Sequence, residues 1–213
     1  MANKTIARLI GHAFGDGSIH HKKLYFIYTN SNHGMQLNVK KLVTSQFGRV
    51  PLNRGTAISG TPRYQYSNRI GKILSSFGAP VGSKVLNRTR VPDWIISGPR
   101  GIKAAYLAAL YDDEGYFRDS PNSRQIVFKA AKASHLRGNL VKYLETLRKL
   151  LREFSIETSQ IKTDQIKKRD DGIEMTSLRF WITSHKNFVL FSKSIPLLHK
   201  EKKRRLLKMA RVG

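Results

Sequence analysis

A nine-residue pattern occurs twice in this chain of 213 residues, about half a chain length apart. Residues 9–17 read LIGHAFGDG, residues 107–115 read LAALYDDEG, and the two stretches align without a gap. Each begins as a helix of small and apolar residues and has an acid at its eighth place, Asp16 or Glu114, followed by glycine. Such an internal repeat constrains the fold strongly, because each copy is expected to build the same structural unit.

The segments after each copy also follow one order. Apolar residues at helical spacing predict helices over 34–48 and 138–154, and alternating apolar and polar residues predict strands on both sides of them. Each half therefore predicts helix–strand–strand–helix–strand–strand–helix. We assign the chain to the α+β class, with two pseudo-symmetric αββαββα halves and two antiparallel sheets. The Pro- and Gly-containing stretch 82–101 suggests domains 1–85 and 102–213, joined by a linker over 86–101.

The first helix of each half carries small residues on one face. Gly11 and Gly15 are four residues apart, so they share a face, and Ala109 occupies the place that matches Gly11. Faces without large side chains let two helices approach closely. We therefore expect the two repeat helices to pack together at the interface between the halves. Asp113 occupies the place that matches Gly15 and departs from this pattern.

Charge restricts the partners of the chain. Lys and Arg number 39 against 14 Asp and Glu, for a net charge of +25, which indicates a polyanionic partner. Nucleic acid is favoured over an anionic membrane surface. The chain has no apolar run long enough to span a bilayer and no cysteine, so we expect an intracellular protein, in the cytoplasm or nucleoid of a prokaryote or in an organelle.

The two repeated acids suggest metal chemistry. If the repeat helices cross along their small faces, Asp16 and Glu114 come close together, and two neighbouring carboxylates require a cation to stay ionised. Hard oxygen ligands beside a phosphate substrate select Mg²⁺. Two such ions, roughly 3.5–4 Å apart, can hold the attacking and leaving oxygens in phosphodiester hydrolysis. For either acid taken alone, a simple turn or a solvated acidic loop remains the alternative.

At these residues the chain resembles the LAGLIDADG homing endonucleases, in the single-chain form with two motif copies. LIGHAFGDG and LAALYDDEG are the copies, and the order of elements extends the resemblance over nearly the whole chain. The resemblance implies motif helices at the domain interface and two sheets that form a saddle over double-stranded DNA. It implies a monomer that cuts a long, nearly palindromic target and leaves short 3′ overhangs. We expect a free-standing, intron-encoded enzyme.

The resemblance also implies site residues. Asp16 and Glu114 correspond to the metal-binding acids, and the main-chain carbonyls of Gly15 and Asp113 are further candidate metal contacts. A basic residue near the end of the second strand of each half is expected to support the attacking water or the transition state. In the second half Lys132 is the candidate for this catalytic role, with Lys129 next, whereas the first half offers only Asn30 and its neighbours at the matching place. The expected metal is Mg²⁺, with Mn²⁺ able to substitute and Ca²⁺ supporting binding without efficient cleavage.

Strand patterns predict the DNA-facing side chains. In TSLRFWITS, residues 176–184, the apolar set Leu178, Phe180 and Ile182 alternates with a polar set that contains Arg179 and Thr183. The polar set is expected to face DNA, where arginine can bind guanine in a bidentate manner. The full set of predicted DNA contacts is Lys22, Asn30, Arg63, Gln65, Arg124, Lys129, Lys162, Lys167, Arg179 and Thr183. The basic segment 199–211 either binds backbone phosphates or is solvated.

Other functions remain open at this point. A non-cleaving nucleic-acid-binding protein of the same fold, either an RNA-splicing maturase or a transcription regulator, would share the charge and the repeat. Retention of both acids favours the endonuclease. A basic ribosome- or membrane-associated protein would explain the charge but would leave the repeated acids without a role.

Overall fold

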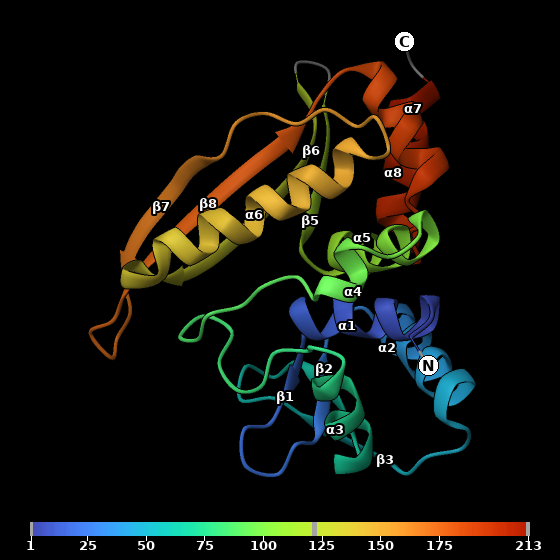
Figure 1. Cartoon of the computed structure of the whole chain (residues 1–213), viewed down its shortest axis with the longest axis vertical. Helices are drawn as coiled ribbons and strands as arrows, with labels where there is room; N and C mark the ends of the chain where they lie inside the picture. Colours follow the sequence, from blue (N-terminus) through green and yellow to red (C-terminus); the bar gives the residue numbers. More distant parts are fainter. Residues whose placement is uncertain (1, 121–122, 212–213) are drawn as a thin grey trace. The chain divides into compact units, whose positions relative to one another are not determined.

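The computed structural model describes residues 2–120 and 123–211, which form two compact units (Figure 1). The first unit comprises Met1–Lys84 and Pro92–Asp113. The second comprises Val85–Val91 and Glu114–Gly213. None of the helices in the described part of the chain is long and apolar enough to cross a membrane.

The first unit contains one antiparallel sheet of four strands, in the order β1-β2-β4-β3. Its helix α1 begins where the Asn3 side chain accepts a hydrogen bond from the main-chain N–H of Ile6 (2.8 Å). Its elements are α1 (Lys4–Phe14), β1 (Gly17–Ile19), β2 (Phe26–Thr29), α2 (His33–Phe47), β3 (Leu52–Thr56), β4 (Pro62–Tyr66), α3 (Asn68–Ser76), α4 (Asp93–Ile96) and α5 (Arg100–Glu114). The last residue of α5, Glu114, belongs to the second unit.

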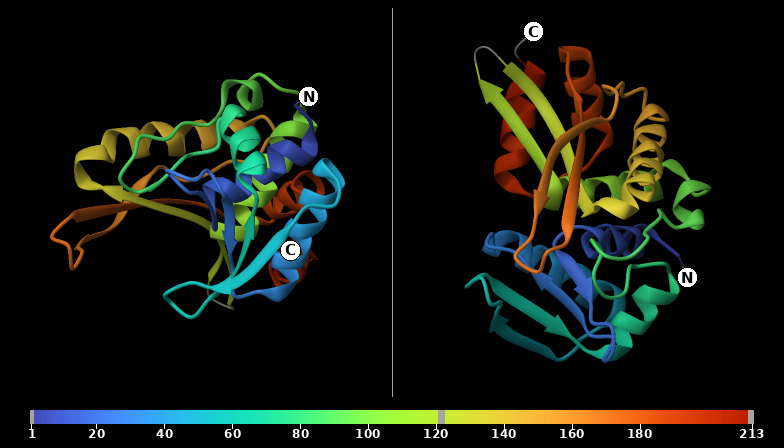
Figure 2. Two further views of the ribbon diagram at one scale, coloured as in Figure 1. Left: turned by 90° about the horizontal axis from the view of Figure 1, so that it is seen from below. Right: turned by 90° about the vertical axis from the view of Figure 1, so that its left-hand side faces the viewer.

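The second unit repeats this arrangement, with its strands in the order β5-β6-β8-β7. Its elements are β5 (Gly115–Ser120), β6 (Ser123–Ala133), a 3₁₀ turn η1 (Ser134–Leu136), α6 (Arg137–Arg152), β7 (Lys162–Lys168), β8 (Glu174–Ile182), α7 (His185–Ser194) and α8 (Lys200–Arg211). In Figure 2, α6 runs along this sheet, and α7 and α8 lie together beside β5. The predicted α+β class and the repeated element order are confirmed.

Helices α1 and α5 are in close contact inside the first unit. A Cβ atom added to Gly11 would lie 2.6 Å from the carbonyl oxygen of Tyr106 and 2.7 Å from the Cβ of Ala109. Only glycine allows this approach, because any larger residue would force the backbones apart. The predicted packing of the small faces of the repeat helices is therefore present.

The units divide the chain differently from the domains 1–85, 86–101 and 102–213 expected from the sequence. Residues 100–113 of α5 cluster with the first unit because they pack against α1. The expected linker 86–101 is also structured. Its helix α4 places the indole N–H of Trp94 2.8 Å from the carbonyl of Phe77, and residues 85–91 belong to the second unit.

Each sheet has one buried face, on which its own helices lie. In the first sheet this face carries Phe26, Tyr28, Tyr64 and Tyr66, and in the second it includes Phe128, Leu178, Phe180 and Ile182. We call it the helix-covered face. The alternate residues on the other side, such as Gln65 and Arg179, are half-buried or exposed, and we call that side the open face.

Candidate functional site

Asp16 follows the end of α1, and hydrogen bonds hold both its main chain and its side chain. Its main-chain N–H donates to the Asp113 carboxylate (3.1 Å), and its carbonyl accepts from the N–H of Thr29 (3.3 Å). The side-chain amide of Asn30 donates to the Asp16 carboxylate at 2.6 Å. Helix α1 ends at Phe14 and is capped by Gly15, whose N–H donates to the carbonyl of Gly11. The half-buried carboxylate of Asp16 therefore has a fixed position and orientation.

The Asp113 side chain is the centre of this network and is 0% exposed. It accepts hydrogen bonds from the Tyr28 hydroxyl (2.7 Å), the His12 Nδ1 (3.0 Å) and the main chain of Asp16. A Cβ atom on Gly15 would lie 2.5 Å from the Asp113 Cβ. The departure of Asp113 from the small-residue pattern thus has a physical reason, because its carboxylate fills the space that Gly15 leaves.

Tyr28 stays protonated in this environment. Burial raises the pKa of the Tyr28 hydroxyl far above its ordinary value, and the neighbouring Asp113 carboxylate raises it further. The hydroxyl therefore acts as a donor to Asp113. Because an ionised carboxylate can only accept, His12 presents Nδ1–H to Asp113, and its ring also packs edge-on against Tyr28.

A buried ion pair joins α1 to α5 one turn away. Arg8 Nη2 lies 2.8 Å from Asp112 Oδ2, and the two side chains are almost fully buried. An ion pair in such surroundings makes the removal of either partner strongly destabilising, since the other charge would stay buried. Asp112 therefore serves the packing of the two helices.

Lys84 reaches the end of α1 from a distant part of the sequence. The segment after α3 pairs with β1 through the bridge of Val81 with Ile19 and the bond from Gly82 N–H to the Ile19 carbonyl (2.8 Å). This pairing brings the Lys84 ammonium to the carbonyls of Phe14 (3.1 Å), Gly15 and Gly17 (2.9 Å). A cation is favourable there because the last carbonyls of a helix carry partial negative charge.

The sequence pattern did not identify Lys84 as a site residue. It lies in the stretch 82–101 that was interpreted as containing the linker, and it belongs to no motif. The available signal was general: the last carbonyls of any helix need a donor from outside the helix.

Glu114 is the last residue of α5 and is exposed. The strand register shows which residues of the second unit match those around Asp16. Gly17 pairs with Tyr28 in the first sheet, and Gly115 pairs with Phe128 in the second. Phe128 therefore corresponds to Tyr28. Ala130, two residues further along, corresponds to Asn30. The two halves therefore differ in the chemistry around their acids.

The position of Lys132 argues against its predicted catalytic role. Lys132 is only 3% exposed, and its ammonium donates to the carbonyl of Asn87 at 2.6 Å. It lies four residues beyond Phe128 on β6, about 13 Å along the strand from the level of Gly115. Its interaction anchors segment 85–91 to the second unit, and we do not keep it among the catalytic candidates.

The open face of the first sheet carries Arg63 and Gln65. Both alternate with the buried Tyr64 and Tyr66 on β4, as the strand pattern predicts. Lys22 lies in the turn between β1 and β2 and is exposed. Asn30, which follows β2, bonds to Asp16 and is therefore part of the acid's surroundings.

The open face of the second sheet carries a cluster of cations. Lys129 and Arg179 are direct neighbours on β6 and β8, and Lys162 pairs with Arg179 from β7. The Lys162 ammonium lies 5.5 Å from the ring centre of Trp181. Lys167 pairs with Met175 on the same side, and Thr183 is exposed just after β8.

Arg124 lies on the other side of that sheet. It shares the helix-covered face with Ile126 and Phe128, and its Nε is 3.3 Å from the carboxylate of Asp119. The Lys208 ammonium lies 3.0 Å from the same carboxylate, and this hydrogen bond holds the pKa of Asp119 below its usual range. The prediction of Arg124 as a DNA contact is therefore corrected, because alternation directs it away from the open face.

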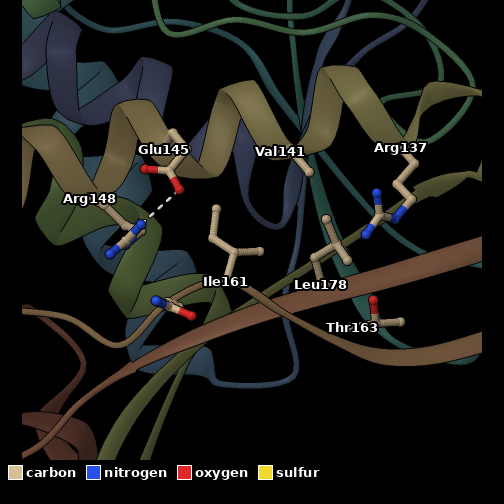
Figure 3. A pocket seen from close by; sticks show the side chains of 8 residues that line it. Arg137, Val141, Glu145, Arg148, Ile161, Thr163 and Leu178 are labelled. Atoms are coloured by element: carbon tan, nitrogen blue, oxygen red, sulfur yellow. Dashed lines mark hydrogen bonds and ion pairs between the residues drawn. The ribbon is translucent and has the colours of Figure 1, made fainter.

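Two further features lie outside the open face. A hollow of about 610 Å³ lies between α6 and the strands β7 and β8, and Arg148 bonds to Glu145 in its wall at 2.7 Å (Figure 3). It opens on the helix-covered side. Most of the basic segment 199–211 forms α8, which begins at Lys200, buries Leu206 and Met209 and packs on α7 and β5.

The oxygen atoms around Asp16 suit a divalent cation. The carbonyls of Phe14, Gly15 and Gly17 already converge on one cation, the Lys84 ammonium, next to a fixed carboxylate. Hard cations such as Mg²⁺ and Ca²⁺ prefer carboxylate and carbonyl oxygens. Among the described residues no group of three or more His, Asp or Glu side chains forms a ready-made metal cluster. A metal at this place would therefore rely on the Asp16 carboxylate and on main-chain carbonyls, and not on a cluster of side chains.

Comparison with solved structures identifies the fold. The chain superposes on I-DmoI in complex with DNA and Ca with a TM-score of 0.57, at 12% identity over 90% of this chain and 88% of that one. It superposes on full-length DUF199/WhiA from Thermatoga maritima with a TM-score of 0.58, at 12% identity over 99% of this chain and 61% of that one. A further neighbour is the N-terminal LAGLIDADG domain of DUF199/WhiA. The chain has a LAGLIDADG fold.

Sequence comparison gives relatives that match only part of their own length. The tRNA-splicing ligase RtcB of Pyrococcus abyssi is 28% identical over 73% of this chain. The DNA-directed RNA polymerase subunit Rpo1N of Methanocaldococcus jannaschii is 25% identical over 86% of this chain. The chain spans only 18% and 15% of the lengths of these relatives. No family model matches the chain.

Proposed function

We propose that the chain is a site-specific DNA endonuclease that hydrolyses phosphodiesters in both strands with the help of divalent metal ions. The observation that carries the proposal is the repeated acid at the end of a motif helix, Asp16 after α1 and Glu114 at the end of α5. The LAGLIDADG fold and the cationic open face of the second sheet support it. A long, nearly palindromic target, 3′ overhangs and an intron-encoded origin belong to the same proposal.

The relatives support a mobile element. Overlapping parts of the chain match a segment of a protein named as a ligase and a segment of a protein named as an RNA polymerase subunit. The activities in those names differ, so the shared segment is best explained by a module that moved into each. An endonuclease that cuts DNA at its insertion site would promote such movement.

The chain's own residues would act as follows. Asn30 and Asp113 hold the carboxylate and the main chain of Asp16, so that the acid keeps its orientation. Asp16, Glu114 and the carbonyl of Asp113 would hold Mg²⁺ or Mn²⁺, which would supply charge neutralisation and an activated water. The Gly15 carbonyl already accepts from the Lys84 ammonium, so it is a weaker candidate for a metal ligand. The Lys84 ammonium would place a fixed positive charge near the reacting phosphate, in the role first assigned to Lys132.

Cleavage of a plasmid library with a randomised insert tests the function. With Mg²⁺ or Mn²⁺ we expect linearised molecules whose ends share one sequence and carry 3′ overhangs. Ca²⁺ should support selective binding with little cutting. Selective binding with no cutting in any metal would instead establish the non-cleaving alternative, a maturase or regulator on this fold.

A further inference from the structure

An acid lies among the cations on the open face of the second sheet. Asp164 Oδ2 is 2.5 Å from the Lys129 ammonium, and its Oδ1 is 3.0 Å from Arg179 Nη1. Strands β5 to β8 contain only two other acids in the described residues, Asp119 and Glu174, and these alternate onto the helix-covered side. Asp164 is thus the acid that a duplex on this face would meet.

A bulge in β7 brings Asp164 to this place. The register between β7 and β8 shifts between Thr163 and Gln165, so Asp164 is the additional residue and has no partner opposite it in the ladder. Bulges redirect a side chain in this way. The side chain is 15% exposed, whereas Lys129 and Arg179 are 47% and 46% exposed. The carboxylate is therefore more buried than the two cations that bind it, and both cations keep nearly half of their side-chain surface exposed.

The cluster fixes the direction of Arg179. Its guanidinium is bound to Asp164 at one end and lies 5.8 Å from the ring centre of Trp181. A guanidinium has five N–H donors, so most of them stay available for a ligand. Hydrogen bonding by Lys129 holds the pKa of Asp164 below its usual range, and the carboxylate is therefore charged at neutral pH.

Stability does not account for the acid. Lys129 and Arg179 are nearly half exposed, and ion pairs whose cations are open to solvent stabilise proteins little, because water and salt screen them. Near DNA the carboxylate is unfavourable, since it repels every phosphate equally, whatever the base sequence. A repulsive group of this kind lowers the affinity for all duplexes and increases the share of binding that comes from correct base contacts.

We propose that Asp164 is a specificity-determining residue, which holds Arg179 and Lys129 for contact with base edges and weakens their binding to phosphates. This inference rests on the proposed function, namely that the open face of the second sheet binds duplex DNA. The expected ligand of Arg179 is the major-groove edge of guanine, which accepts two hydrogen bonds from one guanidinium.

Selection from a randomised duplex library tests the inference. Wild type and Asp164→Asn are each incubated with the library in Ca²⁺, and the bound fraction is sequenced. Asp164→Asn should bind the unselected library several-fold more tightly, because one negative charge is gone. Its preference for guanine at the position that depends on Arg179 should fall by about tenfold.

Asp171→Asn is the matched control. Asp171 forms an ion pair with Arg169 (2.9 Å) in the turn after β7, so its substitution removes the same charge from the same hairpin. It should leave the preference for guanine unchanged. Thermal unfolding of both variants shows whether either has lost its fold.

The outcomes separate the two proposals. If wild type selects a sequence and Asp164→Asn selects it equally well, Asp164 is only a link between strands and the inference is wrong. If wild type selects no sequence from the library, the proposed site-specific function is wrong. A loss of preference in both variants would assign the effect to net charge and would also overturn the role of Asp164.

Discussion

Gly15 and Asp113 form a complementary pair at the residue scale. Gly15→Ala places a Cβ 2.5 Å from the Asp113 Cβ, and we expect a loss of about 1–3 kcal/mol in the free energy of unfolding. Asp113→Ala leaves the Tyr28 hydroxyl and His12 without their acceptor, at a similar cost of about 1–3 kcal/mol. The double variant should lose less than the sum, because alanine at position 113 removes the contacts of the new Cβ with the Asp113 Oδ2 (2.5 Å) and Cγ (2.9 Å), although the contact between the two Cβ atoms remains. Denaturant titration measures all three, and strict additivity would contradict this packing.

Lys84 is the residue whose role the structure changes most. Lys84→Met removes the cation from the carbonyls of Phe14, Gly15 and Gly17, and we expect single-turnover cleavage to slow by about 100-fold. The affinity for the target should change little, because the ammonium is bound to the protein. Lys72→Met, at an exposed position of α3, is the control. Cleavage by Lys84→Met at the wild-type rate would remove Lys84 from the site.

At the scale of elements, the open face of the second sheet is expected to control salt dependence. Lys162→Ala and Lys167→Ala should each reduce the slope of log affinity against log salt by about 0.9, if each lysine neutralises one phosphate. Arg124→Ala should leave the slope unchanged, because Arg124 lies on the helix-covered face beside Asp119. Filter binding over a range of salt concentrations gives the slopes. An equal effect of all three would contradict the assignment of faces.

Local patterns predicted most of these elements. The repeat predicted the same order of helices and strands in both halves. Alternation predicted that Arg63, Gln65 and Arg179 lie on the side of their strands away from the buried residues. The side of a strand is a local property, because successive side chains point in opposite directions. The same rule, applied to the buried Ile126 and Phe128, would have excluded Arg124.

The network around Asp16 could not be predicted in this way. Lys84 is 68 residues from Asp16 in sequence, and only the pairing of Val81 with Ile19 brings it to the end of α1. The role of Asp113 depends on the absence of a side chain at Gly15 on another helix. Asp164 depends on a bulge, which no periodicity indicates. Such features follow from tertiary packing. The end of a predicted helix shows that its carbonyls need a donor, but no sequence pattern shows which residue supplies it.

At the scale of the whole molecule, two complete motif copies predict a monomer. Light scattering of the free protein and of its complex with a target duplex should give one chain, 24.2 kDa, for the protein component. An obligate dimer, with twice that mass, would contradict the view that one chain supplies both halves of the site.

The two halves are expected to contribute unequally. Asp16 is held by Asn30 and Asp113, whereas the positions that match Tyr28 and Asn30 in the second unit are Phe128 and Ala130. Loss of one acid can therefore leave slow nicking of one strand. The effects of the two acid variants on each strand should differ.

The most direct test of a metal-dependent endonuclease measures binding and cleavage on one duplex for wild type, Asp16→Asn and Glu114→Gln. We expect both variants to lose double-strand cleavage in Mg²⁺ or Mn²⁺ while they bind the duplex at least as tightly, because a charge that repels phosphate is gone. Glu157→Gln, at an exposed acid outside the motifs, should cut as wild type does. Full double-strand cleavage by either motif variant, or by wild type in excess chelator, would contradict the account.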